Sequence, residues 1–460
     1  MKKNTSLYTI FISLVATIGG LLFGFDSGVI NGTVKGLESA FQLDEAGIAN
    51  SVASMLLGCA VGALLTGNIA DKFGRKPIMI ITAIGFTISA WGSGIATSSF
   101  EFIVYRIVGG VSVGAASVLA PTYISEVAPK EIRGRLASLQ QLAIVTGIFL
   151  AFLCNYLIEG QSGGVTTQWL LNFQAWRWMF WVEISPAIIF FLAAIFIPES
   201  PRYLVIVGKI DLAKKVLKKI SNVNVDQLVK EIQASVLKDR KPKITDLYDK
   251  VNKRIHPILW AGIGLSVFQQ FVGINVIFYY GSVLWESVGF GESESLQINV
   301  IGGAVNILST VLAIFLIDKT GRKPLLFTGS IIMAIALLVM AFIFGGATFD
   351  PKAEKLILDH TSGIIALIAA NVYVFAFGFS WGPVVWVMLG EMFNNKIRGA
   401  ALSVAAGTQW FANYLITITF PLLKGVLGWT YFFYGSCALL SALFVKKILK
   451  ETKGISLEEM

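Results

Sequence analysis

Long apolar runs recur along the chain at lengths that predict membrane-spanning helices. A helix rises about 1.5 Å per residue, so about 20 apolar residues cross the hydrocarbon core of a bilayer. Runs of this length predict twelve helices, over residues 8–30, 49–70, 77–98, 101–122, 136–158, 176–197, 256–284, 297–317, 324–345, 363–390, 400–421 and 427–447. The pattern therefore predicts an all-α membrane protein.

The composition supports this interpretation. Of the 460 residues, 55% are hydrophobic and 14% are charged, which is too little charge for the surface of an ordinary soluble protein. The first apolar run carries Asp26 and lacks a small-residue cleavage site, so we interpret it as a helix and not as a signal peptide. Cys59, Cys154 and Cys437 lie in predicted helices without paired spacing, and neither a disulfide framework nor a metal site is expected.

Basic residues cluster in alternate loops. The clusters occupy 71–76, 130–135, 202–255, 319–323, 396–398 and 446–453, whereas the loops between them hold scattered lysines. Because loops rich in lysine and arginine stay in the cytoplasm, we expect a multi-pass protein of the cell (inner) membrane with both termini cytoplasmic. The net charge of +9 thus reflects topology, and no nucleic-acid partner is expected.

Two motifs occur twice each, which predicts an internal repeat. D-K-F-G-R-K-P at 71–77 returns as D-K-T-G-R-K-P at 318–324, and E-V-A-P-K-E-I-R-G at 126–134 returns as E-M-F-N-N-K-I-R-G at 391–399. Matched motifs in matched loops predict two six-helix bundles that enclose a site at their interface. The expected domains are an N-terminal bundle (1–201), a cytoplasmic helical linker (202–255), a C-terminal bundle (256–447) and a cytoplasmic tail (448–460).

The linker has the period of amphipathic helices. Its apolar positions are Ala213, Val216, Leu217, Ile220, Val225, Leu228, Val229 and Ile232, with charged residues opposite. We expect short cytoplasmic helices whose charged faces are solvated. A surface for a partner or for anionic lipid is the alternative.

One apolar run, at 266–280, carries amides at depths where lipid offers no hydrogen-bond partner. On a continuous helix, Gln269, Asn275 and Tyr279 fall on roughly one side, with Gln270 at its edge. An unpaired amide in an apolar medium costs on the order of several kcal/mol. This side of the helix must therefore meet another helix, water or a polar ligand.

An acid and a base lie at similar expected depths in two other helices. Asp26 lies about four residues, or about 6 Å, from the outer end of the first predicted helix, and Arg106 lies about five residues into the fourth. Intramembrane carboxylates usually mark ion pathways. We expect Asp26 to alternate between an ion pair with Arg106 and a protonated state, with Glu183 as a third proton-coupling candidate. A permanent ion pair is the alternative.

Taken together, the motifs resemble the sugar porter family of the major facilitator superfamily. They are G-G-L-L-F-G-F-D at 19–26, both D-K-x-G-R-K loops, Y-R-I-V-G-G at 105–110, both E…R-G motifs, P-E-S-P-R at 198–202, Q-Q-F-V-G-I-N at 269–275 and W-G-P-V-V-W at 381–386. The chain looks particularly similar to bacterial members that carry D-xylose with a proton, and beyond them to facilitative glucose transporters.

Two positions depart from this pattern. The terminal P-E-T-K-G reads K-E-T-K-G at 450–454, which is expected to loosen that turn, and Ile148 stands where xylose carriers have glutamine and glucose carriers isoleucine.

A sugar presents hydroxyl groups and apolar ring faces, so its site needs amides and aromatic walls. The candidate residues, which match the family's sugar contacts, are Gln141, Gln269, Gln270, Asn275, Asn306, Trp386 and Gln409, with Phe23, Tyr279 and Trp410 as further walls. Amides of this kind also serve as contacts between helices, but their convergence from several helices favours a ligand pocket. In the tenth helix, Gly378 and Gly382-Pro383 predict a kink that we interpret as a moving inner gate. A static kink is the alternative.

The repeated loops carry acids among their bases. These residues are Asp71, Arg75, Glu126 and Arg133 in the first half, and Asp318, Arg322, Glu391 and Arg398 in the second. We expect ion pairs among them to cross-link helix ends and to hold the inner side closed. Ordinary positive-inside charge is the alternative.

These features favour a monomeric, proton-coupled monosaccharide symporter in the lipid bilayer, working by alternating access. The resemblance implies symport, because symporters of the family keep an acid at the position of Asp26 and uniporters tend to have a neutral residue there. A facilitative uniporter with the same binding site is the alternative. No enzyme and no cofactor are expected, because nucleotide-binding and metal patterns are absent and His256 and His360 stand alone.

Overall fold

Helices make up nearly all of the computed structural model, which describes residues 3–128, 133–220, 224–238, 244–249, 253–350, 355–394 and 397–453. Two short antiparallel strand pairs accompany them: β1 (Tyr248–Asp249) with β2 (Arg254–Ile255), and β3 (Thr348–Asp350) with β4 (Lys355–Ile357). The all-α prediction is confirmed.

Nine of the predicted spans are single long helices. They are α1 (Lys3–Phe41), α2 (Glu45–Phe73), α3 (Arg75–Ile95), α4 (Ser99–Val127), α5 (Arg133–Ser162), α13 (Glu292–Thr320), α14 (Arg322–Gly346), α17 (Arg398–Thr419) and α18 (Leu427–Lys447). Over the described residues, 11 spans are long and apolar enough to cross a membrane, and α17 is not among them. Its polar residues Thr408, Gln409 and Asn413 lower its mean hydropathy.

The other three spans are each broken into two helices. These are α6 (Ala175–Trp181) with α7 (Ile184–Phe196), α11 (Pro257–Phe271) with α12 (Ile274–Ser287), and α15 (His360–Phe379) with α16 (Trp381–Met392). The expectation of a continuous helix through 266–280 is wrong, because Gly273 has a φ of 83°, a left-handed conformation that glycine adopts without steric cost. The kink expected in the tenth span is present, but the break lies at Ser380. Pro383 therefore falls in the first turn of α16, where its missing N–H removes no helical bond.

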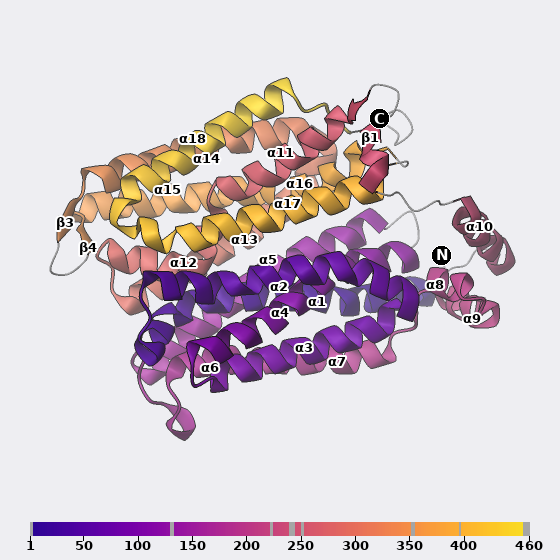
Figure 1. Ribbon diagram of the computed structural model, residues 1–460, viewed down its shortest axis with the longest axis horizontal. Helices are drawn as coiled ribbons and strands as arrows, with labels where there is room; N and C mark the ends of the chain where they lie inside the picture. The colour runs from indigo at the N-terminus through magenta and orange to yellow at the C-terminus, as the bar shows by residue number, and fades with distance from the viewer. Residues whose placement is uncertain are drawn as a thin grey trace. The chain divides into compact units, whose positions relative to one another are not determined.

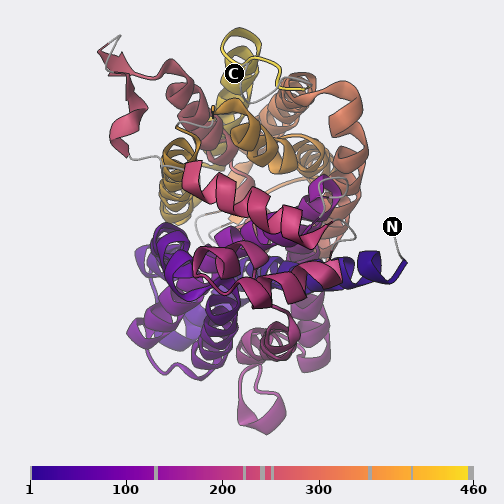
Figure 2. The ribbon, with the colours of Figure 1, turned by 90° about the vertical axis from the view of Figure 1, so that its right-hand side faces the viewer.

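The linker forms the expected amphipathic helices: α8 (Pro201–Ile206), α9 (Ile210–Ile220) and α10 (Val225–Lys238). Helix α9 buries Ala213, Leu217 and Ile220. It lies beside the start of α1 (Figure 2). The ammonium of Lys219 is 5.8 Å from the centre of the Tyr8 ring there. Three short 3-10 turns, η1 (Leu170–Asn172), η2 (Ile244–Leu247) and η3 (Pro421–Val426), complete the chain.

Contacts within the chain define two units. Unit 1 comprises Met1–Asp26, Leu57–Gly147 and Phe180–Lys241, and unit 2 comprises Ser27–Leu56, Ile148–Met179 and Pro242–Met460. In unit 1, α3 packs against α4 and α7; in unit 2, α14 packs against α15 and α18, and α11 packs against α17 (Figure 1). The unit boundaries fall inside α1, α2, α5 and α6, so they do not follow the two halves of the sequence. The domain bounds that the sequence predicts, 1–201, 202–255, 256–447 and 448–460, stay a prediction.

Replacing Gly273 with alanine should destabilise the protein by about 1–3 kcal/mol, because a side chain is strained at this φ. The added Cβ would also lie 2.6 Å from the Tyr434 ring. Thermal unfolding in detergent measures the effect as a lower Tm. Gly67→Ala is the matched control, since a Cβ at Gly67 in α2 meets nothing within 4 Å. Equal Tm values for the two variants would contradict the left-handed break.

Candidate functional site

Asp26 on α1 and Arg106 on α4 form a buried ion pair within unit 1. Arg106 Nη1 lies 2.5 Å from Asp26 Oδ1, and Nη2 donates to the backbone oxygen of Asp26 over 3.2 Å. Both side chains are 1% exposed. The expected pairing is present, but the expected distance of Asp26 from the end of its helix is wrong, because α1 continues to Phe41 and Asp26 lies about 22 Å before its end.

A second carboxylate joins this pair. Glu183 is fully buried at the break between α6 and α7, and its carboxyl group lies beside that of Asp26. Neither of its oxygens accepts a hydrogen bond from the described residues, and the same holds for Asp26 Oδ2. One guanidinium faces two buried carboxylates, and burying the second charge without a partner is costly. The cluster is therefore suited to hold a proton between Asp26 and Glu183.

Gly109 makes room for the Asp26 carboxylate. A Cβ at Gly109 would lie 3.3 Å from Asp26 Oδ2 and would also collide with Ser89 Oγ, a buried hydroxyl without a partner among the described residues. The sequence analysis did not assign a role to Gly109 or Ser89. The motif Y-R-I-V-G-G could have identified Gly109, because Gly109 follows Arg106 by three residues and lies on the same side of α4.

Three amides meet at the break between α11 and α12 in unit 2. Asn275 Nδ2 donates to Gln270 Oε1 over 2.5 Å, and Gln270 Nε2 donates to Gln269 Oε1 over 3.4 Å. Gln269 Nε2 in turn donates to the backbone oxygen of Trp381 over 2.8 Å. The break, and not a continuous helical face, brings these amides together.

A second polar group connects α12 with α17. Asn413 Nδ2 donates to Tyr279 Oη over 3.4 Å, and Thr417 Oγ1 donates to Asn413 Oδ1 over 3.1 Å. Gln409, one turn before Asn413, is 9% exposed, and its Oε1 accepts no hydrogen bond from the described residues. Asn413 was missed, although its spacing of four residues from Gln409 places both on one face of the helix.

The remaining candidates of unit 2 differ in exposure. Asn306 is buried on α13, and Gly378 on α15 lies opposite its Oδ1. Trp410 is 7% exposed, whereas Trp386 is 42% exposed. Trp381 is fully buried, and its indole N–H donates to the backbone oxygen of Leu326 over 3.1 Å.

Two of the proposed sugar contacts, Gln141 and Phe23, belong to unit 1. Both are half-buried. The neighbouring Gln140 is 7% exposed, and neither polar atom of its amide has a partner among the described residues. Its amide lies against Gly20 of α1, where a Cβ would be 2.6 Å away. Sequence reasoning chose Gln141 and overlooked Gln140.

The repeated loops form the same ion-pair arrangement in each unit. In unit 1, Arg75 Nη2 binds Asp71 Oδ1 at 3.0 Å and Glu126 Oε1 at 2.9 Å. In unit 2, Arg322 binds Asp318 Oδ1 at 3.3 Å and Glu391 Oε1 at 2.8 Å. The expected pairs are thus present for these six residues.

Arg398 and Arg133 are the remaining two residues of this predicted network. Arg398 makes no ion pair with the residues that the structure describes. The side chain of Arg133 lies outside the described residues.

Glu199 and Glu451 complete the two loops and were missed. Glu199 accepts from the backbone N–H of Arg75 over 2.9 Å, and Glu451 accepts from that of Arg322 over 3.0 Å. Each carboxylate thus lies at a helix N-terminus, where negative charge is stabilised. Glu199 lies in the motif P-E-S-P-R and Glu451 lies in K-E-T-K-G, so these two motifs could have identified both residues.

Glu451 keeps this role although Lys450 replaces the proline of the family pattern. Burial alone would raise the pKa of Glu451, but hydrogen bonds from the backbone N–H groups of Arg322, Lys453, Lys323 and Thr452 outweigh it and lower the pKa. The carboxylate therefore stays charged at neutral pH. The expected loosening of this turn is not seen.

Comparison with known proteins agrees with these motifs. The model of the family described as "Sugar (and other) transporter" matches residues 12–460. The chain is 53% identical to a glucose transport protein of Synechocystis over 98% of this chain and 97% of the relative. It is 40% identical to the D-xylose-proton symporter of Escherichia coli over 100% of this chain and 96% of the relative. An inward open structure of the xylose transporter XylE from E. coli matches with a TM-score of 0.82 and 39% identity, covering 98% of both chains.

Replacing Arg106 with methionine should destabilise the protein by about 3–5 kcal/mol, because it leaves the buried carboxylates of Asp26 and Glu183 without a cation. In the Asp26→Asn background the same substitution should cost less, since one of the two charges is already absent. A double-mutant cycle of thermal unfolding in detergent measures the difference. Additive effects would show that Arg106 and Asp26 are not energetically coupled.

Proposed function

The chain belongs to the family of sugar transporters, and we propose that it is a proton-coupled monosaccharide symporter that works by alternating access. The observation that carries the coupling is the buried cluster of Asp26, Glu183 and Arg106, in which two acids share one base. Its excess carboxylate gives a proton a place to bind inside the protein.

The proton acts on the contact between α1 and α4. When Asp26 is ionised, its carboxylate binds Arg106 and holds the two helices together. Protonation removes the charge and weakens this bond, while Glu183 offers a second site for the same proton. Loading and releasing a proton therefore changes how firmly α1 is held, and this links the proton gradient to the alternation between states.

The amides of unit 2 bind a neutral, hydroxyl-rich substrate. Gln269, Gln270, Asn275 and Gln409 each present both a donor and an acceptor, as a sugar hydroxyl does. None of them is charged, so they offer no ion pair to an acidic or basic substrate. Trp386, which is 42% exposed, is available to cover an apolar face of the sugar. We include Gln141 and Phe23 of unit 1, and Asn306, Tyr279 and Trp410, in the same binding role.

Among monosaccharides, we propose a preference for glucose-like hexoses over xylose. Ile148 is 7% exposed and offers no hydrogen bond at the position where xylose carriers have a glutamine. The greater identity to the glucose transport protein than to the D-xylose-proton symporter, 53% against 40%, supports the same preference.

The chain is a multi-pass membrane protein, and we place it in the cell membrane as a monomer with both termini in the cytoplasm. The ion pairs of Arg75 and Arg322 then lie on the inner face, where they hold the inside closed. We assign no enzymatic activity and no cofactor to the chain.

A facilitative uniporter with the same sugar site is the second candidate. The Asp26–Arg106 ion pair favours the uniporter only if it never separates. A carboxylate that is held permanently in an ion pair cannot bind and release a proton. The two functions differ in whether a protonophore abolishes sugar accumulation in proteoliposomes.

Replacing Asp26 with asparagine should abolish accumulation of sugar against its gradient and preserve exchange of internal for external sugar. The amide cannot carry the proton, while the amide cluster in unit 2 is untouched. Uptake driven by a pH gradient, compared with counterflow in the same proteoliposomes, measures both activities. Accumulation by this variant that a protonophore still abolishes would overturn the assignment of Asp26.

Replacing Ile148 with glutamine should strengthen competition by xylose against labelled glucose by about 2- to 10-fold, the value of one added hydrogen bond. Ile148→Leu is the matched control, since it keeps an apolar side chain. The half-inhibitory concentrations of xylose and glucose are compared for both variants. Equal ratios in the two variants would contradict a role of this position in choosing the sugar.

A further inference from the structure

The three amides at the break between α11 and α12 form a chain of hydrogen bonds that all run in one direction. Asn275 Nδ2 donates to Gln270 Oε1, Gln270 Nε2 donates to Gln269 Oε1, and Gln269 Nε2 donates to the backbone oxygen of Trp381. The donating and accepting ends of an amide side chain have nearly the same shape, so its partners decide which way it faces. The direction of the chain therefore needs a cause outside the amides.

The cause lies on α16. Gln269 Nε2 is 2.8 Å from the backbone oxygen of Trp381 and 3.4 Å from that of Gly382. A carbonyl oxygen accepts hydrogen bonds and cannot donate one, so the NH2 group of Gln269 must face α16 and its oxygen must face Gln270. Gln270 then turns its NH2 group to Gln269 and its own oxygen to Asn275. Asn275 is left to donate.

The side chain of Trp381 fixes the position of this carbonyl. It is fully buried, and its indole N–H donates to the backbone oxygen of Leu326 over 3.1 Å and to Ser330 Oγ over 2.9 Å, both on α14. Ser330 Oγ in turn lies 2.9 Å from Ser441 Oγ on α18. Helices α14 and α18 thus hold the residue at which the chain of amides ends.

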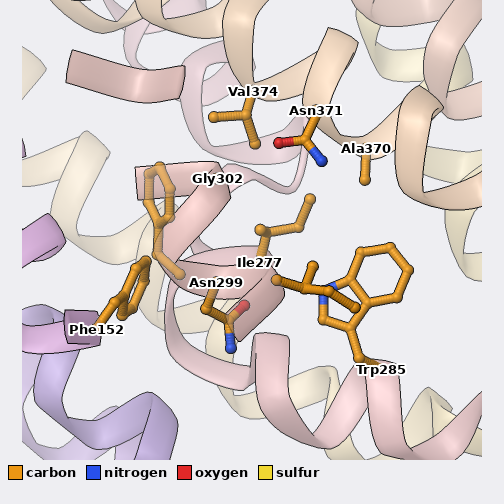
Figure 3. Close-up of a pocket in the computed structure, with 10 residues that line it drawn as sticks. Phe152, Ile277, Trp285, Asn299, Gly302, Ala370, Asn371 and Val374 are labelled. Atoms are coloured by element: carbon orange, nitrogen blue, oxygen red, sulfur yellow. The ribbon is translucent and has the colours of Figure 1, made fainter. Parts of the chain in front are cut away.

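Asn275 is the accessible end of the chain. Gln269 and Gln270 are 3% and 5% exposed, whereas Asn275 is half-buried, and its Oδ1 takes no part in the chain. The small cavity of unit 2 is a different site, because its volume of ≈ 20 Å³ holds no sugar (Figure 3). Ile277 in the wall of this cavity follows Asn275 by two residues and so lies on the opposite side of α12.

We propose that the backbone oxygen of Trp381 sets the direction of the three amides, so that Asn275 presents its oxygen to the substrate and selects a sugar hydroxyl that donates. The identity of the ligand rests on the proposed function, but the direction of the chain does not. Trp381 is a positioning residue, because it is fully buried and acts on the substrate only through the amides. A group that accepts but cannot donate does not satisfy the Asn275 oxygen.

A pair of substitutions tests the direction of the chain without transport. Asn275→Asp replaces the donating NH2 group with an oxygen that faces the oxygen of Gln270, and should lower the Tm in detergent. Gln270 cannot turn over to relieve this contact while Gln269 presents its own oxygen on the other side. In the Gln269→Leu background Gln270 is free to turn and to donate to the introduced carboxylate. Asn275→Asp should therefore cost much less in that background.

Asn413→Asp is the matched control. Asn413 lies outside the chain and donates to Tyr279 Oη, so its substitution should cost the same with glutamine or leucine at position 269. If Asn275→Asp alone does not fold, recovery of the fold in the Gln269→Leu background supports the proposal equally. Equal costs of Asn275→Asp in the two backgrounds, including failure to fold in both, would overturn it.

Glucose analogues test the consequence for the substrate. In each analogue one hydroxyl is replaced by hydrogen or by fluorine, and competition with labelled glucose is measured in proteoliposomes for the unsubstituted protein and for Asn275→Leu. The hydroxyl that Asn275 contacts is the one whose removal weakens competition less in Asn275→Leu. At this position we expect hydrogen and fluorine to weaken competition equally, by about 2- to 10-fold, because fluorine accepts and cannot donate.

Two results of the analogue series would contradict the role of the Asn275 oxygen. One is competition restored by fluorine at the position that Asn275 contacts, and the other is a series in which no hydroxyl is coupled to Asn275. A protein that carries no monosaccharide at all would instead refute the proposed function. The Tm comparison would still decide whether Trp381 sets the direction of the amides.

Discussion

Buried polar groups that lipid cannot satisfy are the constraint on which this structure depends. Each break in a span frees backbone carbonyls, and in unit 2 the two broken spans supply each other with donors. Tyr373 of α15 donates its hydroxyl to the backbone oxygen of Val272 over 2.7 Å, at the break between α11 and α12. Gln269 of α11 donates to the backbone oxygen of Trp381 over 2.8 Å, at the break between α15 and α16. The two breaks therefore stabilise one another, and Gln269 serves the fold as well as the proposed substrate site.

The same constraint acts on charge in unit 1. Glu183 lies at the break between α6 and α7, so an interruption of the backbone and a buried carboxylate coincide at one place. Arg106 neutralises the charge of Asp26 by its ion pair with it. The carboxylate of Glu183 has no cation of its own among the described residues. A protein that only needed stability would gain from an apolar residue at position 183. We infer that the second acid is retained because a proton must be held there.

The sequence predicted the spans well because hydropathy is a local property, and the limits of α3, α14 and α18 fall within a few residues of those expected. It also predicted the Asp26–Arg106 pair, since a buried acid requires a base. The breaks were harder to predict. A glycine such as Gly273 is common in apolar runs, and only the contacts of distant helices decide whether the backbone opens there. Glu199 and Asn413 were missed for the same reason, because their partners come from segments that lie far away in the sequence.

Helix α17 shows how site and fold share the same residues. Among the described residues it is the one long helix that is not apolar enough to count as a membrane span, yet Gln409, Trp410, Asn413 and Thr417 are all buried. Helix α17 packs against α11, and Asn413 of its polar face donates to Tyr279 of α12, so neighbouring helices compensate for the low affinity of α17 for lipid. The residues that weaken α17 as an independent membrane span are thus the ones that supply amides to the proposed site. A span of this kind is stable only inside a folded protein, so hydropathy alone ranks it below its neighbours although its place in the fold is equally well defined.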